Sequence, residues 1–110
     1  NLNIGKLYFL RKKVTNKVDN SHGDKRDLLS SLALISLYDQ KFEQSYVLYN
    51  QLIDELKVRD SQTLFLAGVA STAAKHHENA IALFELSNLK NRNYPESRYA
   101  LGLLYLQIQN

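Results

Sequence analysis

Three histidines and one pair of adjacent carboxylates have the clearest capacity for metal binding or proton transfer: His22, His76, His77, Asp54 and Glu55. Neighbouring residues of a helix point in different directions, so His76 and His77 would chelate poorly there, and in a turn we expect both to be exposed. No third ligand stands at a spacing that suits zinc. The two carboxylates fall on a polar helix face, without the apolar surroundings that acid–base catalysis requires. These residues predict neither a metal site nor a proton-transfer site.

Motifs of known catalytic mechanism are also missing from the sequence. It has no G-x-S-x-G turn, no glycine-rich phosphate loop and no H-E-x-x-H helix. It has no cysteine, which excludes disulfides and thiolate zinc sites but leaves the compartment open. We therefore expect the protein not to be an enzyme and to use no cofactor, metal or small-molecule substrate.

The composition is that of an ordinary soluble domain. Of the 110 residues, 45% are hydrophobic and 23% are charged, which is enough for one domain with a modest core. The single proline and four glycines favour long helices joined by short loops. No apolar run is long enough to predict a transmembrane helix, and no signal-peptide pattern opens the sequence. We expect a soluble protein of the cytoplasm or periplasm.

Basic residues gather near the N-terminal end. Residues 1–30 hold seven basic and three acidic side chains, whereas the whole chain has a net charge of only +3. Such a segment can meet an acidic partner, a nucleic-acid backbone or an anionic surface. A solvated helix face is the simpler interpretation, because few aromatic residues are interleaved. The residues of this basic patch are Lys6, Arg11, Lys12, Lys13 and Lys17.

Apolar residues recur at helical spacing along most of the chain. They predict a helix over residues 1–20, although β-branched residues there leave a short strand at 7–10 as an alternative. The turn-forming residues 19–24 predict a loop. Asp60 or Ser61 is expected to cap a helix, and Pro95 to begin one. The other helices are predicted over residues 25–38, 42–57, 61–74, 78–90 and 95–109.

Small and large residues recur in these helices at a fixed distance. Gly68 and Gly102 each follow an apolar residue, and the distance between them is about 34 residues, a period typical of helical repeats. The pair Ala80-x-x-x-Phe84 lies between them, and Tyr105 follows the second glycine by three residues. A less regular copy of this pattern, Leu32-Ala33 followed by Ser45-x-x-x-Tyr49, lies 35 residues before Ala67-Gly68 and Ala80-x-x-x-Phe84.

This pattern resembles the tetratricopeptide-repeat (TPR) family, in which the same period recurs. The resemblance implies an all-α fold in which helical hairpins form a right-handed α-α superhelix, or solenoid. Its units would be a helix at 1–20, interpreted as the end of a preceding repeat, a degenerate repeat at 24–58, a repeat at 60–93 and the first helix of a truncated repeat at 95–110. The incomplete last unit and the missing initial methionine lead us to expect a piece of a longer protein.

The small residues have a physical interpretation. Glycine inside a helix costs about 1 kcal/mol relative to alanine, so we expect Gly68 and Gly102 where another backbone approaches closely. Ala80 is expected to face its partner helix for the same reason, with Phe84 filling the wider space one turn later.

The resemblance also implies a function, because first helices of TPR hairpins line a concave groove. We expect a scaffold that binds a protein or peptide segment in this groove, with Phe65 and Tyr99 alongside each other as aromatic anchors. The carboxylate clamp of some family members does not fit, since Ser30, Leu34 and Glu96 stand where it needs other residues. The predicted groove residues are Gln62, Phe65, Val69 and Thr72, then Glu96, Tyr99, Leu103 and Leu106, and in the first hairpin Asp27, Ser30, Leu34 and Leu37.

Alternatives remain at this point. Further repeats or residues 2–18 can cover the apolar groove, and the basic patch can bind nucleic acid or an anionic surface, although nucleic acid is the less favoured partner. Scaffolds of this kind also serve bacterial flagellar, motility and secretion assemblies. The sequence leaves the identity of the partner and the oligomeric state open.

Overall fold

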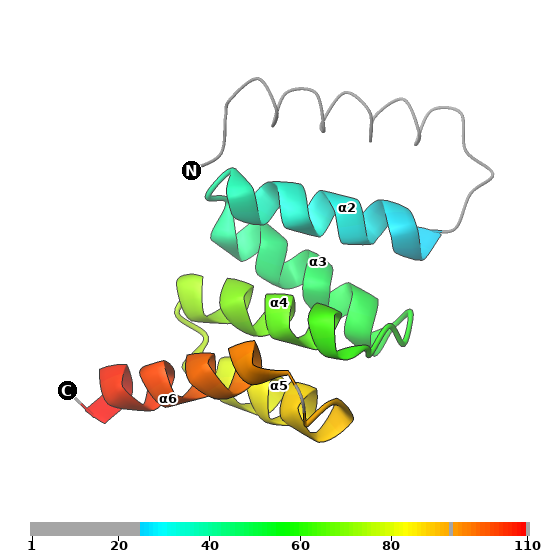
Figure 1. Ribbon diagram of the computed structural model, residues 1–110. Helices are drawn as coiled ribbons and strands as arrows, with labels where there is room; N and C mark the ends of the chain where they lie inside the picture. Colours follow the sequence, from blue (N-terminus) through cyan, green and yellow to red (C-terminus); the bar gives the residue numbers. More distant parts are fainter. Residues whose placement is uncertain (1–24, 93, 110) are drawn as a thin grey trace.

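The structure is a computed structural model that describes residues 25–92 and 94–109, and this part of the chain is helical without strands (Figure 1). The helices predicted to begin at residues 42, 61 and 95 are confirmed at those starts, and the helix predicted over 25–38 is helical from the first described residue. The described helices are α2 (Lys25–Tyr38), α3 (Phe42–Asp54), α4 (Ser61–Ala73), α5 (His77–Lys90) and α6 (Pro95–Gln109).

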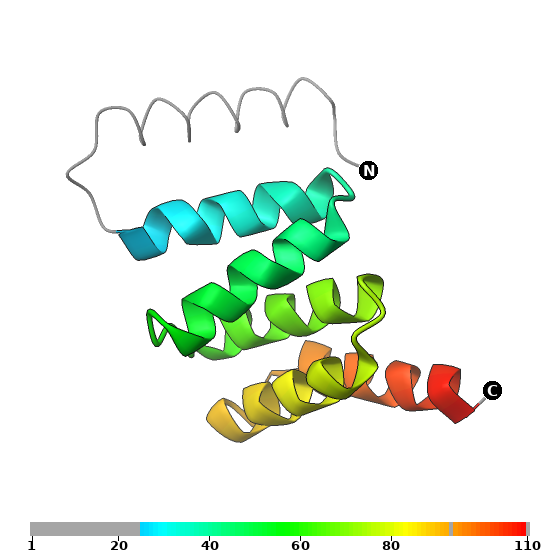
Figure 2. The same cartoon turned by 180° about the vertical axis from the view of Figure 1, so that it is seen from behind.

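Each helix packs against the next one in the chain and runs antiparallel to it (Figure 1). Helix α4 also contacts α2 and α6, so these three form one layer on the side facing the viewer in Figure 1. Helices α3 and α5 lie on the opposite side, which Figure 2 shows from behind. Within the described ranges, no helix has both the length and the hydropathy needed to cross a bilayer.

The turns after α2 and α4 have the same geometry, 35 residues apart. Gln40 and Lys75 both adopt left-handed backbone, with φ of 64° and 71°. The next amide closes each turn in the same way: Lys41 N–H donates to the Ser36 carbonyl at 2.9 Å, and His76 N–H donates to the Ser71 carbonyl at 2.8 Å. These bonds satisfy carbonyls that a helix end leaves unpaired. The two hairpins therefore repeat each other in backbone as well as in sequence.

The buried side chains of the two hairpins also correspond at a distance of 35 residues. Ser45 and Ala80, which are 0% exposed, occupy equivalent places in α3 and α5, as do the buried rings of Tyr49 and Phe84. In the first hairpin the Ser45 hydroxyl donates to the Ala33 carbonyl at 2.8 Å. The irregular first copy thus keeps its arrangement, with a hydrogen-bonded serine where the second has alanine.

The α3–α4 connection accounts for the change of period. The first residues of α3 and α5, Phe42 and His77, are 35 residues apart. The first residues of α4 and α6, Ser61 and Pro95, are only 34 residues apart. The additional residue therefore lies between α3 and α4. There Lys57 has a φ of 59°, which is incompatible with a right-handed helix. For this reason α3 ends at Asp54, before the predicted residue 57.

The ends of α4, α5 and α6 were predicted in most details. Asp60 caps α4, because its carboxylate accepts a hydrogen bond from Thr63 N–H at 3.2 Å and another from the Thr63 hydroxyl at 2.7 Å. Pro95 begins α6 as expected. Helix α5 begins at His77, one residue before the predicted start. The helix at 1–20, its strand alternative and the loop at 19–24 lie outside the described residues.

The two repeated glycines have different surroundings. A Cβ atom built on Gly68 would lie 2.5 Å from Phe84 Cε1, so an aromatic side chain, rather than the expected second backbone, occupies the space beside it. A Cβ atom built on Gly102 would have no described atom within 4 Å, apart from its chain neighbours and the nearby backbone of α6. The prediction of a close backbone approach is therefore wrong for Gly102.

Candidate binding site between helices α4, α5 and α6

Helices α4, α5 and α6 surround a cavity of about 290 Å³. Two of its lining side chains, Thr72 and Gln107, are polar, and the others are apolar. Ligand sites are commonly concave and mostly apolar with a few polar groups. The lining residues are Val69, Thr72, Ala73, Phe84, Ala100, Leu103, Leu104 and Gln107.

The floor of the cavity is fixed by packing in the second hairpin. Phe84 and Leu104 are each 2% exposed, and with Ala80 they form a buried cluster. Because Gly68 has no side chain, the Phe84 ring can lie against α4. The Thr72 hydroxyl donates to the Gly68 carbonyl at 2.9 Å, so it turns toward its own helix. The floor of the cavity is therefore buried and largely apolar.

Polar contacts fix α6 against the two helices before it. The hydroxyls of Ser87 and Ser97, both 0% exposed, lie 2.6 Å apart. The Ser87 hydroxyl is also 2.9 Å from the Ser61 carbonyl at the start of α4. Buried hydroxyls are stable only with such partners. This network sets the position of α6, and with it that of the cavity wall.

The structure brings three of the predicted groove residues, Val69, Thr72 and Leu103, to this cavity. Phe65 is half-buried instead, because its ring packs 5.9 Å from Phe84 and 5.6 Å from Tyr94 between ring centres. Phe65 is therefore part of the helix packing as much as of a surface. The sequence did not indicate this, since Tyr94 lies in a connection outside the helical pattern.

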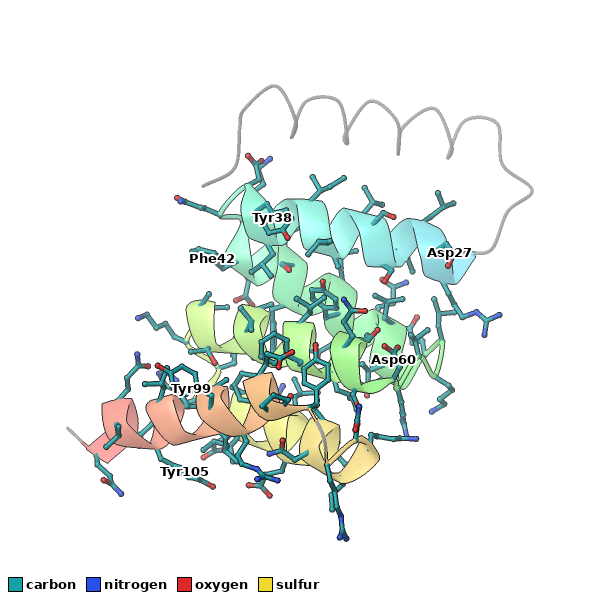
Figure 3. All side chains as sticks on the ribbon, viewed as in Figure 1. Asp27, Tyr38, Phe42, Asp60, Tyr99 and Tyr105 are labelled. Carbon is teal, nitrogen blue, oxygen red and sulfur yellow. The ribbon has the colours of Figure 1, made fainter. Side chains whose placement is uncertain are left out.

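The remaining predicted residues of α4 and α6 are on the surface. Tyr99 is 71% exposed, Leu106 60% and Leu103 45%. Spaced at positions i, i+4 and i+7, these three form an apolar stripe along α6. Figure 3 shows Tyr99 and Tyr105 on different sides of this helix. Gln62 and Glu96 are exposed as well.

The first hairpin contributes less to this surface. Asp27 is exposed, whereas Ser30, Leu34 and Leu37 are half-buried. Leu37 packs against the buried cluster that contains Ala33 and Tyr49. The basic patch, Lys6, Arg11, Lys12, Lys13 and Lys17, lies outside the described residues.

A polar cluster that we did not predict joins α3 to the turn before α5. The rings of Tyr46 and His76 stack with centres 3.9 Å apart, and His76 Nε2 lies 2.9 Å and 3.1 Å from the two carboxylate oxygens of Glu43. The Asn79 amide donates to the Tyr46 hydroxyl at 2.7 Å. His76 and His77 are thus half-buried, not exposed as we had expected. Glu43 and His76 are separated in the sequence by the same number of residues as Tyr46 and Asn79. This equal spacing was the sequence signal from which the cluster could have been predicted.

This cluster is better suited to holding two hairpins together than to metal binding. The side chain of Glu43 is 65% exposed and that of His76 is 38% exposed, so this water-accessible pair contributes little stability. No group of three metal-binding side chains exists in the described part of the chain.

Tyr49 is the most perturbed ionisable side chain of the core. Burial raises the pKa of its phenol well above the ordinary value of 10.0, and the nearby Tyr38 raises it further. No described residue forms a hydrogen bond with its hydroxyl. Tyr49 therefore belongs to the apolar packing of the first hairpin and does not contribute to the cavity.

The sequence matches no family model, and no curated protein is significantly similar to it.

Proposed function

We propose that the protein is a helical-repeat scaffold of the TPR kind, in which stacked hairpins form a right-handed superhelix. The equivalent turns at Gln40 and Lys75 support the repeat. The equivalent buried pairs Ser45–Tyr49 and Ala80–Phe84 support it as well. Stacking is the expected arrangement, since a single hairpin cannot bury its apolar faces alone.

In this proposal the face formed by α4 and α6 binds a segment of another protein and performs no catalysis. The observation that carries the proposal is the apolar cavity beside an exposed apolar stripe. Phe84 and Leu103 line the cavity, and Leu103 shares the exposed stripe of α6 with Tyr99. Clustered exposed apolar residues on a soluble protein commonly mark interaction sites. Aromatic residues at such sites supply large contact area at low entropic cost.

The occupant that fits this surface is an amphipathic or extended segment with one or two apolar anchors. A cavity of about 290 Å³ accommodates one large side chain, and the stripe accommodates apolar residues that follow it along the segment. Thr72 and Gln107 are the polar groups at the cavity. Most of the affinity is therefore expected from apolar burial.

Site-specific photo-crosslinking in the native host tests this proposal. We expect a photoreactive phenylalanine analogue at position 103 to yield a specific adduct with another protein. The matched control is position 47, because Val47 is similarly exposed, at 53% against 45% for Leu103, but lies on α3. Equal adducts at both positions, or none at position 103, would contradict the proposed surface.

A further inference from the structure

A second cavity, of about 500 Å³, lies beside α5, α6 and the connection that joins them. Its volume is in the range of roughly 300–1,000 Å³ that is usual for ligand pockets. It shares no lining residue with the cavity beside Leu103, so the two sites are separate. The residues that line it are Glu85, Asn88, Leu89, Arg92 and Arg98.

Two arginines make this second cavity positively charged. Arg92 and Arg98 are exposed, and their side chains form no hydrogen bond or ion pair with another residue of the described ranges. Glu85 is the acidic residue of the lining, and its carboxylate accepts a hydrogen bond from the Tyr105 hydroxyl at 3.3 Å. The lining therefore carries one net positive charge, and both guanidinium groups are available to a ligand.

The backbone at both arginines is held in place through Ser87. The Ser87 hydroxyl lies 2.6 Å from that of Ser97, which precedes Arg98. The Ser87 carbonyl accepts a hydrogen bond at 3.1 Å from the N–H of Asn91, which precedes Arg92. Both serines are 0% exposed. A preorganised backbone lowers the entropic cost of binding.

The α5 side of the cavity adds an apolar contact and a neutral polar group. Glu85, Asn88 and Leu89 are spaced at positions i, i+3 and i+4, so they share one side of the helix. The Leu89 side chain is 72% exposed. The Asn88 side chain is half-buried and has no hydrogen-bond partner among the described residues. A ligand here meets charge, an amide and an apolar surface together.

We propose that this cavity binds an acidic segment of another protein. A carboxylate side chain of that segment pairs with Arg92 and Arg98, and an adjacent apolar side chain packs on Leu89. Arginine clusters recognise acidic and phosphorylated motifs, and a guanidinium group binds a carboxylate through two parallel hydrogen bonds. This site is distinct from the cavity beside Leu103, so it does not rest on the function proposed above.

The charge count selects a carboxylate over a phosphate group. One net positive charge balances a single carboxylate. A phosphate group carries about −1.5 to −2 at neutral pH, and the Glu85 carboxylate in the same lining would repel it. The repeating phosphates of a nucleic acid would meet the same repulsion.

NMR titration of the ¹⁵N-labelled protein with short peptides tests the proposal, because it detects weak binding and locates it. The probe is the peptide AALEA, acetylated and amidated so that glutamate supplies its only charge. The peptide AALQA lacks that charge, and AAAEA lacks the apolar side chain. Inorganic phosphate and the peptide AAL with a free carboxylate end are titrated separately.

We expect AALEA to shift the amide signals of Asn88, Leu89, Arg92 and Arg98 saturably, with an affinity that falls as salt is added. The double variant Arg92→Gln, Arg98→Gln should weaken binding about tenfold or more. The matched control, Lys41→Gln with Lys57→Gln, removes the same charge from exposed residues elsewhere and should change the affinity less than about twofold.

Leu89→Ala should weaken the binding of AALEA about threefold and leave that of AAAEA unchanged, since only the first peptide contacts this side chain. Because Leu89, Arg92 and Arg98 are exposed, these variants should melt at the temperature of the wild type.

Three results would overturn the proposal. The first is equal affinity of the double arginine variant and the wild type for AALEA. The second is equal affinity of the wild type for AALQA and AALEA, because the carboxylate would then contribute nothing. The third is tighter binding of inorganic phosphate or of the free carboxylate end, because the ligand would then be a phosphate group or the end of a chain.

Discussion

The ring of Phe84 lies against the backbone of Gly68 so closely that a Cβ atom there would be 2.5, 2.7 and 2.8 Å from three ring carbons. Gly68→Ala should therefore destabilise the protein by about 1–3 kcal/mol, because the ring is buried and cannot move away freely. The same change at Gly102 meets open space and should stabilise the helix by about 0.5–1 kcal/mol. Urea unfolding of both variants measures the difference. Equal effects would contradict the assigned packing.

Ala80 gives a second test of the α4–α5 contact. It is 0% exposed, so Ala80→Leu should overpack the hairpin and cost roughly 1–3 kcal/mol. Ala82 lies on the exposed side of the same helix, and Ala82→Leu should be within about 0.5 kcal/mol of wild type. Thermal melts that do not distinguish the two variants would count against the alignment of the hairpins.

Tyr49 makes stability sensitive to alkaline pH. Its folded pKa is raised above the ordinary 10.0, so above pH 10 the unfolded chain releases this proton while the folded chain retains it. Stability is fully present below pH 10 and is lost as the pH rises toward the folded pKa, with a slope of up to about 1.4 kcal/mol per pH unit.

Tyr49→Phe should remove this part of the alkaline slope. Because no described residue bonds to its hydroxyl, the variant should be as stable as wild type at pH 7, or more stable by about 1 kcal/mol. Chemical unfolding at pH 7 and pH 11 compares the two proteins. A large loss of stability at pH 7 would mean that the hydroxyl has a partner.

The two predicted aromatic anchors should respond differently to truncation. Phe65→Ala removes a ring that packs on Phe84 and Tyr94, and should cost about 1–3 kcal/mol of stability. Tyr99 is 71% exposed, so Tyr99→Ala should remain within about 0.5 kcal/mol of wild type. Circular dichroism melts measure both. A Phe65→Ala variant as stable as wild type would contradict this packing and favour a role for Phe65 at the surface alone.

Local sequence signals were sufficient for much of the fold. The cap at Asp60 and the proline at the start of α6 act within a few residues, and apolar spacing marks the face that each helix buries. The positions of the helices could therefore be predicted without knowing which elements pack on them. The repeated Ala80-x-x-x-Phe84 pattern correctly indicated which side of α5 is buried. These predictions required no knowledge of distant contacts.

Contacts between distant segments were harder to predict. The packing of Tyr94 on Phe65 depends on the path of a connection, and the stacking of His76 on Tyr46 joins two residues of different hairpins. Gly102 matches Gly68 in sequence but lacks its neighbour, because periodicity identifies equivalent places without stating what covers them. The candidate site was therefore predicted only in part, at Val69, Thr72 and Leu103.

The central claim is that the face between α4 and α6 binds a protein segment through apolar contacts. The most direct test takes the segment that crosslinks at position 103 as a synthetic peptide and measures its affinity by calorimetry between 50 and 500 mM salt (chosen as about a tenfold range). We predict less than about a threefold change with salt, and a loss of about tenfold or more in the Tyr99→Ala, Leu103→Ala double variant. An affinity that falls steeply with salt and is unchanged in that variant would contradict the claim and favour the basic patch at Lys6 to Lys17.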